Sequence, residues 1–334
     1  MSFEIWNRRY TGSKYKLADW MFNIIDLHCK GESFCDIFAG TGIISYYALS
    51  RMKSVTINDF LFSNEIIYKA FFLQKYFDEN KINTYKKIFQ TYDATKIKDN
   101  YVSKNFGGKF FSPKDALLIG EIRESIEQAN NLNEKERAIL IASLLYSADK
   151  AANTVGHYDA YIKGHIIPDH FRFELIKPYK TTATVEIYRQ NANILAKEIQ
   201  SDIVYIDPPY NSRQYSRFYH ILENIATWKK PKLYGVALKP EPENMSDYCR
   251  NSALSAFSKL INDLKCKYIV VSYNNTYSSK SSSSVNKMTL ENIKKVLSEK
   301  GRLSCFEKPY QFFNTGKTEF SDHKEFIFLV EVNV

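Results

Sequence analysis

The sequence predicts an α/β protein in which short buried strands alternate with helices. The prediction rests on three apolar runs, at residues 33–37, 55–57 and 203–206. Each run is too short for a helix and is followed by glycine, acidic or proline residues, which is typical of buried strands. Segments with helical spacing of apolar residues follow the first two runs, as expected when parallel strands are joined by crossover helices.

The remaining elements follow from periodicity and from residues that start or stop a helix. Asn133 followed by acidic residues is a helix start. The sequence predicts further strands at 183–188, 267–274, 302–307 and 325–331, and helices near 17–25, 43–50, 65–80, 117–130, 134–152, 221–228, 255–264 and 289–300.

The run at 203–206 leads into the sequence Asp207-Pro208-Pro209-Tyr210. Two consecutive prolines cannot continue the hydrogen-bond ladder of a sheet, so the strand ends there in a stiff turn. A rigid turn that only closes a sheet is the simpler interpretation. Asp-Pro-Pro-aromatic is rare by chance in a chain of this length, however, which favours a functional turn.

This turn suits methyl transfer to an amino nitrogen that is conjugated with a ring. Such a nitrogen is a poor nucleophile because its lone pair is delocalised. The carboxylate of Asp207 and the backbone carbonyl of Pro208 can each accept one N–H, which favours a lone pair directed at an incoming methyl group. Tyr210 can stack on the base. Pro208 and Pro209 hold these groups in a fixed relation, as catalysis by positioning requires.

A glycine turn follows the first run, in the sequence Asp36-Ile37-Phe38-Ala39-Gly40-Thr41-Gly42. The two glycines let the backbone approach a ligand closely, and the next helix presents its N-terminus to that ligand. The third glycine of the dinucleotide fingerprint is missing, which argues against NAD. Asp59 lies 23 residues after Asp36, at the end of the second run, where an acid typically binds ribose hydroxyls. The same geometry serves the ribose of S-adenosylmethionine.

Two other segments are candidates for the same cofactor. A polar loop, Tyr10-Thr11-Gly12-Ser13-Lys14, precedes an amphipathic helix. A surface loop with a packing helix is an equally good interpretation of that segment alone. Asn193 precedes Asp207 by fourteen residues and is expected at another strand end, where a polar side chain can contact the adenine of the cofactor.

Polar, aromatic and basic residues crowd the segment 153–183 and the loop after Tyr210. Irregular loops of this composition suit base reading and phosphate binding, although a solvated loop is as good an interpretation for any one residue. We expect no metal site, because the histidines of the segment have no ligand spacing. The candidate DNA-binding residues are His157, Tyr158, Lys163, Arg172, Arg213, Tyr215 and Arg217.

The composition sets the class of partner and the compartment. There are 46 basic and 37 acidic residues, and the net charge of +9 favours a polyanionic partner without requiring one. The five cysteines have no Cys-x-x-Cys spacing, and the sequence has neither a signal peptide nor a membrane-spanning run. We therefore expect free thiols in a reducing cytoplasm, and no membrane partner.

The motifs, taken in order, resemble those of the α-group (Dam-like) N6-adenine DNA methyltransferases. Tyr10 to Lys14 is similar to the N-terminal cofactor motif of that family, and Asp36 to Gly42 resembles its Phe-x-Gly-x-Gly motif, with Ala39 between Phe38 and Gly40. Asn58-Asp59 matches the ribose-binding acid, and Asp207 to Tyr210 matches the catalytic motif. Residues 207–216 look closest to the adenine methylases that accompany type IIS restriction enzymes.

The resemblance implies a class I S-adenosylmethionine-dependent methyltransferase fold, with a mostly parallel seven-stranded sheet flanked by helices. It implies a catalytic domain at 1–80 and 184–334, and an inserted, partly helical target recognition domain at 81–183. Asn193 stands where the family often has an acid, so its cofactor contact is the weakest of the set. The cofactor contacts that the resemblance implies are Tyr10, Lys14, Asp36, Phe38, Ala39, Gly40, Thr41, Gly42, Asn58, Asp59 and Asn193.

The implied reaction is methylation of N6 of adenine in double-stranded DNA. The family flips the adenine out of the duplex, because its amino group is otherwise paired. The resemblance also implies the modification enzyme of a restriction–modification system, with a cognate endonuclease that acts on the same site. Two alternatives stay open: the same chemistry on RNA or on a protein glutamine, and a catalytically silent DNA-binding or subunit protein.

Overall fold

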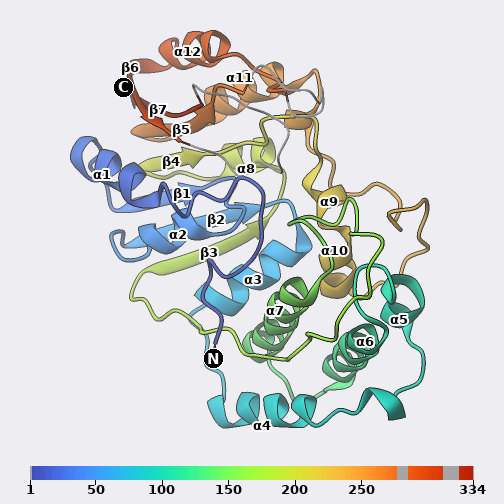
Figure 1. The fold of residues 1–334 in the computed structure, drawn as a ribbon. Helices are drawn as coiled ribbons and strands as arrows, with labels where there is room; N and C mark the ends of the chain where they lie inside the picture. The colour runs from blue at the N-terminus through green and yellow to red at the C-terminus, as the bar shows by residue number, and fades with distance from the viewer. Residues whose placement is uncertain (1, 277–284, 311–322, 334) are drawn as a thin grey trace. The chain divides into compact units, whose positions relative to one another are not determined.

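The structure is a computed structural model that describes residues 2–276, 285–310 and 323–333. The chain forms two compact units (Figure 1). The first, which we call the helical unit, consists of Met1–Ser13, Leu61–Thr181 and Ser216–Glu243. The second, the sheet unit, consists of Lys14–Phe60, Thr182–Tyr215 and Asn244–Val334. The helical unit thus contains almost all of the segment 81–183 that was predicted to recognise DNA, together with residues on either side of it.

The sheet unit contains the seven-stranded, mostly parallel sheet that the family resemblance implies. The strand order is β3-β2-β1-β4-β5-β7-β6. The first five strands of this order are parallel to one another, and β7 is antiparallel to both β5 and β6. The strands are β1 (Ser33–Asp36), β2 (Ser54–Asp59), β3 (Thr184–Arg189), β4 (Ile203–Ile206), β5 (Tyr268–Asn274), β6 (Gly301–Pro309) and β7 (Lys324–Val332).

Both faces of the sheet are buried, which explains why its central strands are apolar without alternation. On one face, Cys35, Val204 and Ile206 belong to a core that includes side chains of α8, α11 and α12. On the other face, Phe34 contacts Phe22 of α1, with ring centroids 6.0 Å apart. The helices of this unit are α1 (Ala18–His28), α2 (Ile43–Ala48), α8 (Ala192–Glu198), α11 (Ala253–Asp263) and α12 (Leu290–Ser298).

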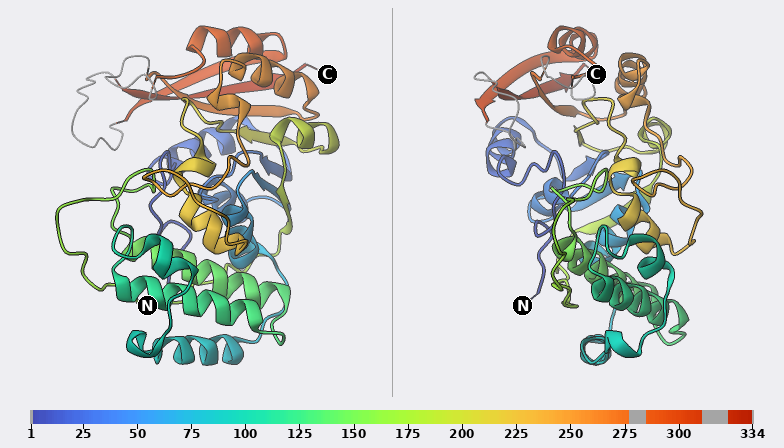
Figure 2. Two further views of the ribbon diagram at one scale, coloured as in Figure 1. Left: turned by 90° about the vertical axis from the view of Figure 1, so that its right-hand side faces the viewer. Right: turned by 45° about the vertical axis from the view of Figure 1, so that its right-hand side comes forward.

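The helical unit is built around α6 and α7, which lie side by side (Figure 2). The predicted start at Asn133 is confirmed: its side chain accepts from Glu136 N–H and the Glu136 side chain accepts from Asn133 N–H, which forms a capping box. The helices are α3 (Phe62–Phe72), α4 (Glu79–Gln90), α5 (Tyr101–Phe106), α6 (Pro113–Gln128), α7 (Glu134–Ala151) and α10 (His220–Thr227). The short α9 (Tyr215–Phe218) joins the two units along the chain.

The helix predicted over 65–80 ends earlier than expected. It is α3, which stops at Phe72, and α4 begins at Glu79. The reason is local, because the side chain of Asp78 accepts hydrogen bonds from the backbone N–H groups of Asn80 and Lys81 and so starts a new helix.

Buried cations of the helical unit bond to backbone carbonyls near helix ends. Lys135 donates to the carbonyls of Lys69 and Ala70, at 3.0 and 2.8 Å, in the last turn of α3. Arg123 donates to the carbonyl of Ile225, at 2.7 Å, in the last turn of α10. Such carbonyls have no partner within their helix, so these side chains complete its C-terminus. Across the described ranges, no helix combines the length and the apolar composition needed to cross a bilayer.

Candidate active site

Three acidic residues lie at the carboxyl edge of the central parallel strands. Asp36 is the last residue of β1, Asp59 is the last residue of β2, and Asp207 directly follows β4. Because β2, β1 and β4 are neighbours in the sheet, the three strand ends meet at one edge. In open α/β sheets this edge is where ligands bind.

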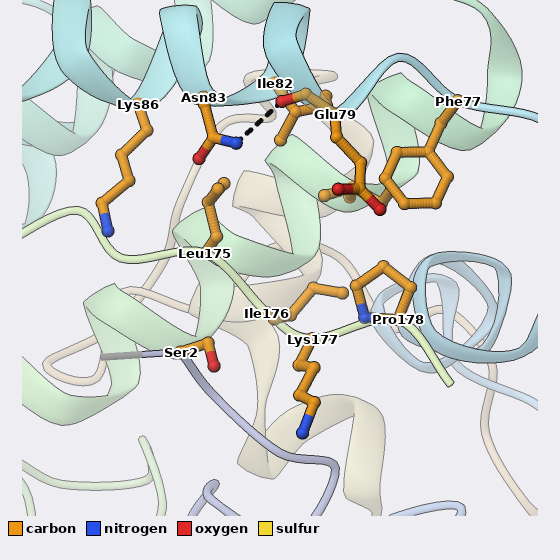
Figure 3. A pocket seen from close by; sticks show the side chains of 11 residues that line it. Ser2, Phe77, Glu79, Ile82, Asn83, Lys86, Leu175, Ile176, Lys177 and Pro178 are labelled. Atoms are coloured by element: carbon orange, nitrogen blue, oxygen red, sulfur yellow. Dashed lines mark hydrogen bonds between the residues drawn. The ribbon is translucent and has the colours of Figure 1, made fainter. Parts of the chain in front are cut away.

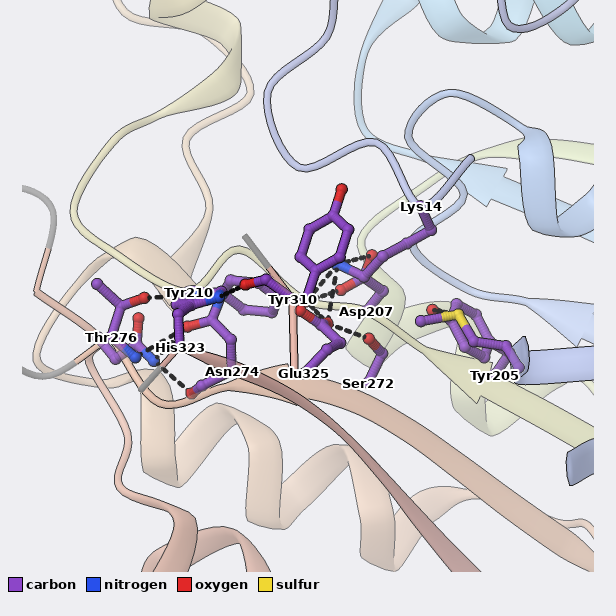
Figure 4. A network of polar contacts seen from close by, with 12 residues as sticks. Lys14, Tyr205, Asp207, Tyr210, Ser272, Asn274, Thr276, Tyr310, His323 and Glu325 are labelled. Carbon is purple, nitrogen blue, oxygen red and sulfur yellow. Dashed lines mark hydrogen bonds and ion pairs between the residues drawn. The ribbon is translucent and has the colours of Figure 1, made fainter. Parts of the chain in front are cut away.

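Asp207 is held in a network of buried polar side chains (Figure 4). The Lys14 ammonium lies 3.1 Å from Oδ2 of Asp207, and the Tyr210 hydroxyl donates a hydrogen bond to Oδ1. Lys14 Nζ also donates to the Tyr210 hydroxyl, at 2.5 Å. Lys14 is predicted to contact the cofactor, and the structure shows its ammonium paired with the carboxylate of Asp207.

Glu325 completes this network from β7, and none of the sequence motifs includes it. Its Oε1 lies 3.3 Å from Lys14 Nζ and 3.3 Å from the Tyr210 hydroxyl, and it accepts a hydrogen bond from Ser272 Oγ at 2.7 Å. The side chain is 3% exposed. One signal for Glu325 was available in the sequence, since a charged residue opens a long apolar strand.

Burial and neighbouring charges shift the pKa values of three groups in this network. Burial raises the pKa of Asp207 above its ordinary value, although Lys14 acts in the opposite direction. Burial lowers the pKa of Lys14, but the attraction of Asp207 and Glu325 outweighs it, and the net shift is upward. Burial also raises the pKa of the Tyr210 hydroxyl, so Tyr210 remains a neutral donor at physiological pH.

The glycine turn runs from Asp36 to Gly42 and is fixed by its own backbone and by β2. Gly40 and Gly42 have φ of +54° and +77°, which favour glycine over other residues. The Gly40 N–H donates to Asp59 Oδ2 at 2.9 Å, and the Ala39 N–H donates to the carbonyl of Asn58 at 2.8 Å. The structure therefore brings Asp59 to the turn, as a cofactor site at this edge requires. Thr41 is buried beside the two glycines.

Asp36 is a buried carboxylate with spare hydrogen-bonding capacity. Its Oδ2 accepts from the Ser45 N–H and hydroxyl, at 3.1 and 2.7 Å. Its Oδ1 is buried and has no hydrogen-bond partner among the described residues. Burial raises the pKa of Asp36 to about 7, with the Ser45 hydrogen bonds opposing the shift. An unsatisfied acceptor beside a glycine turn fits a site for a polar ligand with donor groups.

The two predicted asparagines use their amides within the fold. Asn58 donates to the carbonyls of Ile37 and Gln190, at 3.0 and 3.1 Å, and so ties together the ends of three strands. Asn193 donates to the carbonyl of Ala256 at 2.7 Å and accepts from the Tyr248 hydroxyl at 2.9 Å. Tyr248 also contacts the ring of Phe38 edge-on, with centroids 5.0 Å apart. The ring of Phe38 is thus supported by Tyr248, which precedes α11 in the chain.

Tyr10 belongs to the helical unit, whereas the other predicted cofactor residues belong to the sheet unit. Its ring stacks on that of Tyr219 with centroids 4.8 Å apart, and the Arg8 guanidinium lies 4.5 Å from its centroid. Within its own unit, Tyr10 is part of an aromatic and cationic cluster.

The candidate DNA-binding residues divide into core, paired and exposed groups. Tyr158 is fully buried and donates to Asp149 Oδ1 at 3.0 Å, so it is a core residue of the helical unit. His157 stacks on Phe218, and Arg217 donates to the carbonyl of Pro240. Arg172 is 77% exposed and pairs with Glu174 at 2.8 Å. Lys163 is exposed, and Arg213 and Tyr215 lie in the sheet unit shortly after Tyr210.

A pocket of 410 Å³ opens in the helical unit, and none of the predicted site residues lines it (Figure 3). It is lined by one face of α4 and by residues 175–178. Its two lysines have acidic partners outside the lining: Lys86 pairs with Glu174 at 2.6 Å and Lys177 with Glu4 at 3.5 Å. Their charges are therefore already compensated, and we assign no ligand to this pocket. No group of three or more His, Cys, Asp or Glu side chains is arranged to hold a metal ion in the described parts of the chain.

Comparison with known proteins gives a consistent family match. Residues 10–296 match the family model described as D12 class N6 adenine-specific DNA methyltransferase. The type II methyltransferase M.NlaIII of Neisseria lactamica is 28% identical over 94% of this chain and 95% of its own length. M.CviAII of Paramecium bursaria Chlorella virus 1 is 31% identical over 97% of this chain and 98% of its own length. The chain also matches 53% of M.FokI of Planomicrobium okeanokoites, at 29% identity.

Proposed function

The chain belongs to the D12 class N6 adenine-specific DNA methyltransferase family, and from this premise we propose that it methylates N6 of one adenine within a specific site of duplex DNA. One observation carries the proposal: the Asp207-Pro208-Pro209-Tyr210 turn lies at the same sheet edge as the glycine turn that begins at Asp36. A site for the amino group and a site for a methyl donor are thereby adjacent on one rigid scaffold.

In this proposal, Asp207 and the Pro208 carbonyl each accept one hydrogen of the adenine amino group. The lone pair of N6 is then directed away from both acceptors, toward the methyl donor. Tyr210 stacks on the base, which has left the duplex because its amino group is otherwise paired. Pro209 keeps the aromatic ring in register with the two acceptors.

The methyl donor of this family is S-adenosylmethionine, and the residues of the glycine turn fit it. When bound, it would supply the methyl group from its sulfonium to N6, leaving a neutral thioether and one proton that passes from the nitrogen to solvent. Asp59 suits the ribose hydroxyls, Asp36 has an acceptor to spare, and Gly40 and Gly42 allow close approach of the backbone. We propose that Phe38, Ala39 and Thr41 contact the cofactor directly, and that Asn58 and Asn193 act through the strand and helix ends that they hold.

We propose that the helical unit recognises the DNA, mainly through two loops at residues 153–170 and 229–243. The ion pair of Lys239 with Asp159 ties the two loops together. Ten large hydrophobic side chains are exposed in the described structure, and half of them lie on these loops, which is more than a solvated loop requires. They are Val155, Ile162, Ile166, Tyr234 and Val236. Apolar side chains on lysine-bearing loops suit contact with bases and groove walls.

We further propose that the protein is the modification enzyme of a restriction–modification system, acting in the cytoplasm. The named relatives are type II methyltransferases. A cognate endonuclease would act on the same sequence and need not contact this chain.

The test is methyl transfer to mixed-sequence plasmid DNA from S-adenosylmethionine carrying a labelled methyl group, followed by sequencing that detects modified adenines. We expect label only at N6 of adenine, within one short sequence motif. Parallel reactions with RNA and with protein extract test the two alternative substrates. Label in RNA or protein and none in DNA would overturn the proposed substrate. Absence of S-adenosylmethionine binding by calorimetry would overturn the proposal that the chain is an enzyme.

A further inference from the structure

The hydroxyl of Tyr210 has two carboxylates within reach and only one proton to donate. It donates to Asp207 Oδ1, and Glu325 Oε1 lies 3.3 Å away on another strand. Lys14 contacts both carboxylates, at 3.1 Å and 3.3 Å. The hydroxyl and the ammonium therefore each have a second partner ready if Asp207 is engaged elsewhere.

Glu325 is fixed in place by its strand. It lies opposite Asn274 in the antiparallel pairing of β7 with β5, and Ser272 of β5 donates to its Oε1 at 2.7 Å. Its side chain is almost fully buried. A buried carboxylate is costly and seldom stabilises a fold better than an apolar residue of similar size. Its position beside the catalytic turn indicates a role in the reaction.

We propose that Glu325 is a positioning residue for methyl transfer, which receives the Tyr210 hydroxyl and shares the Lys14 ammonium when the adenine amino group binds Asp207. The inference rests on the proposed function and adds to it a residue outside the catalytic turn. The amino group needs an oxygen of Asp207 as its acceptor. Tyr210 holds one of these oxygens and Lys14 holds the other, so the amino group competes with a contact that is already present.

Glu325 also affects how strongly Asp207 accepts a hydrogen bond. Burial is the main cause of the raised pKa of Asp207, Lys14 opposes it, and Glu325 contributes to the rise. By drawing part of the Lys14 charge toward itself, Glu325 leaves Asp207 a more basic acceptor. The titratable groups that face Asp207 or Lys14 come from every element packed around them, namely Asp36, Tyr205, Tyr210, Tyr310, His323 and Glu325.

The test is E325Q, which keeps the shape and the acceptor oxygen but removes the charge. Asp207 must be ionised to accept the amino group, so activity falls as pH drops through its pKa. Without the charge at 325, Lys14 acts on Asp207 alone, and the acid limb of kcat moves to lower pH. We expect kcat at neutral pH to fall about tenfold, while KM for DNA changes by less than about threefold. E331Q, which removes an exposed carboxylate of the same strand paired with Arg302, is the matched control and should behave as wild type.

A second variant and a second measurement guard against misfolding and against failure of the proposed function. Ser272→Ala releases Glu325 without removing its charge, so kcat should fall while the acid limb stays in place. The carboxyl carbon of Asp207, labelled with ¹³C and assigned by its absence in D207N, should titrate at lower pH in folded E325Q without any DNA. An unchanged titration with unchanged kcat in E325Q, or wild-type kinetics in Ser272→Ala when E325Q does not fold, would overturn the inference. The titration of Asp207 is measured without DNA and is independent of adenine methylation. A wild-type protein that methylates no adenine would therefore refute the proposed function, whereas the titration in E325Q tests the role of Glu325.

Discussion

The two units of this protein use buried cations in different ways. In the helical unit, Lys135 and Arg123 donate to main-chain carbonyls at the ends of α3 and α10. In the sheet unit, Lys14 is surrounded by side chains, with Asp207 and Glu325 as its ionic partners. The first arrangement stabilises helices, because it satisfies acceptors that have no partner within the helix. The second places like charges close together and is a weak source of stability.

The difference changes what the net charge of +9 means. Basic residues that cap helices are not available to phosphates, so the number of DNA contacts cannot be inferred from the net charge. The difference between the two units also gives a rule that mutations can test. Charge-removing substitutions at the carboxyl edge of the sheet should lower the rate of methyl transfer, whereas those in the helical core should lower stability.

The largest effect is expected for Asp207→Asn. Asn is the same size as Asp but has one acceptor oxygen in place of two and no charge to pair with Lys14. Methyl transfer should fall on the order of 10²- to 10⁴-fold, as for loss of a positioned catalytic group. Calorimetry should give cofactor affinity close to that of the wild type. Asp202→Asn removes a carboxylate at the opposite end of the same strand, where it pairs with Lys267, and should leave the rate unchanged. Equal losses in both variants would refute the rule.

Asp36 gives the next largest effect, on stability as a function of pH. Because burial raises its pKa to about 7, the folded state holds this proton more tightly than the unfolded state does. The resulting stabilisation is complete below about pH 4 and is lost as the pH rises to about 7. Asp36→Asn has no such loss. The difference in unfolding free energy between variant and wild type should therefore shift in favour of the variant by about 3 kcal/mol between pH 5 and pH 8.

Urea unfolding of both proteins at several pH values, without cofactor, measures this shift. A difference that does not change with pH would mean that Asp36 is ionised in the fold throughout this range. In that case a buried charge at the carboxyl edge of the sheet would cost little stability, which would contradict the contrast drawn between the two units.

In the helical unit, Arg123→Met should affect stability and leave the chemistry intact. Met keeps much of the aliphatic packing but leaves the carbonyls of Ile225 and Ala226 without their donor. We expect a loss of about 1–3 kcal/mol, the usual cost of a buried polar group left unsatisfied. Arg302→Met removes an exposed partner of Glu331 and should cost less than about 1 kcal/mol. Thermal unfolding compares the two variants, and kcat of folded Arg123→Met below one third of wild type would contradict the rule.

The turns that begin at Asp207 and Asp36, and the central strands that precede them, could be predicted because their signals are local. Two prolines end a strand wherever they stand, and two glycines mark a backbone that other residues rarely adopt. The local signal for Glu325, a charge at the start of an apolar strand, does not show what its side chain contacts. Its contact with Lys14 depends on the pairing of β7 beside β5, which joins residues far apart in the sequence.

The helical unit was harder to predict for the same reason. Residues 216–243 belong to the helical unit, which is otherwise built from residues before 182. In the sequence, however, they follow closely after the Asp207–Tyr210 turn of the sheet unit. Tyr158 is predicted to bind DNA because its segment is polar, aromatic and basic, and the structure shows it buried against Asp149 of α7. Polarity along the chain predicts exposure only on average, and a tertiary partner reverses it for a single side chain.

The smallest effect is expected at the loops of the helical unit, where Lys163→Ala removes an exposed cation that lies 5.7 Å from the ring centroid of Tyr161. If these loops bind DNA, Lys163 neutralises about one phosphate, and the slope of log K against log salt should decrease in magnitude by about one. Affinity should fall severalfold at low salt and converge with that of the wild type as salt increases, while thermal unfolding stays the same. Lys53→Ala is the control, since Lys53 precedes β2 at the amino end of the strands and pairs with Glu32. Identical salt slopes for Lys163→Ala and Lys53→Ala would show that exposure and charge alone do not mark the DNA-binding surface, and the two loops would lose their assigned role.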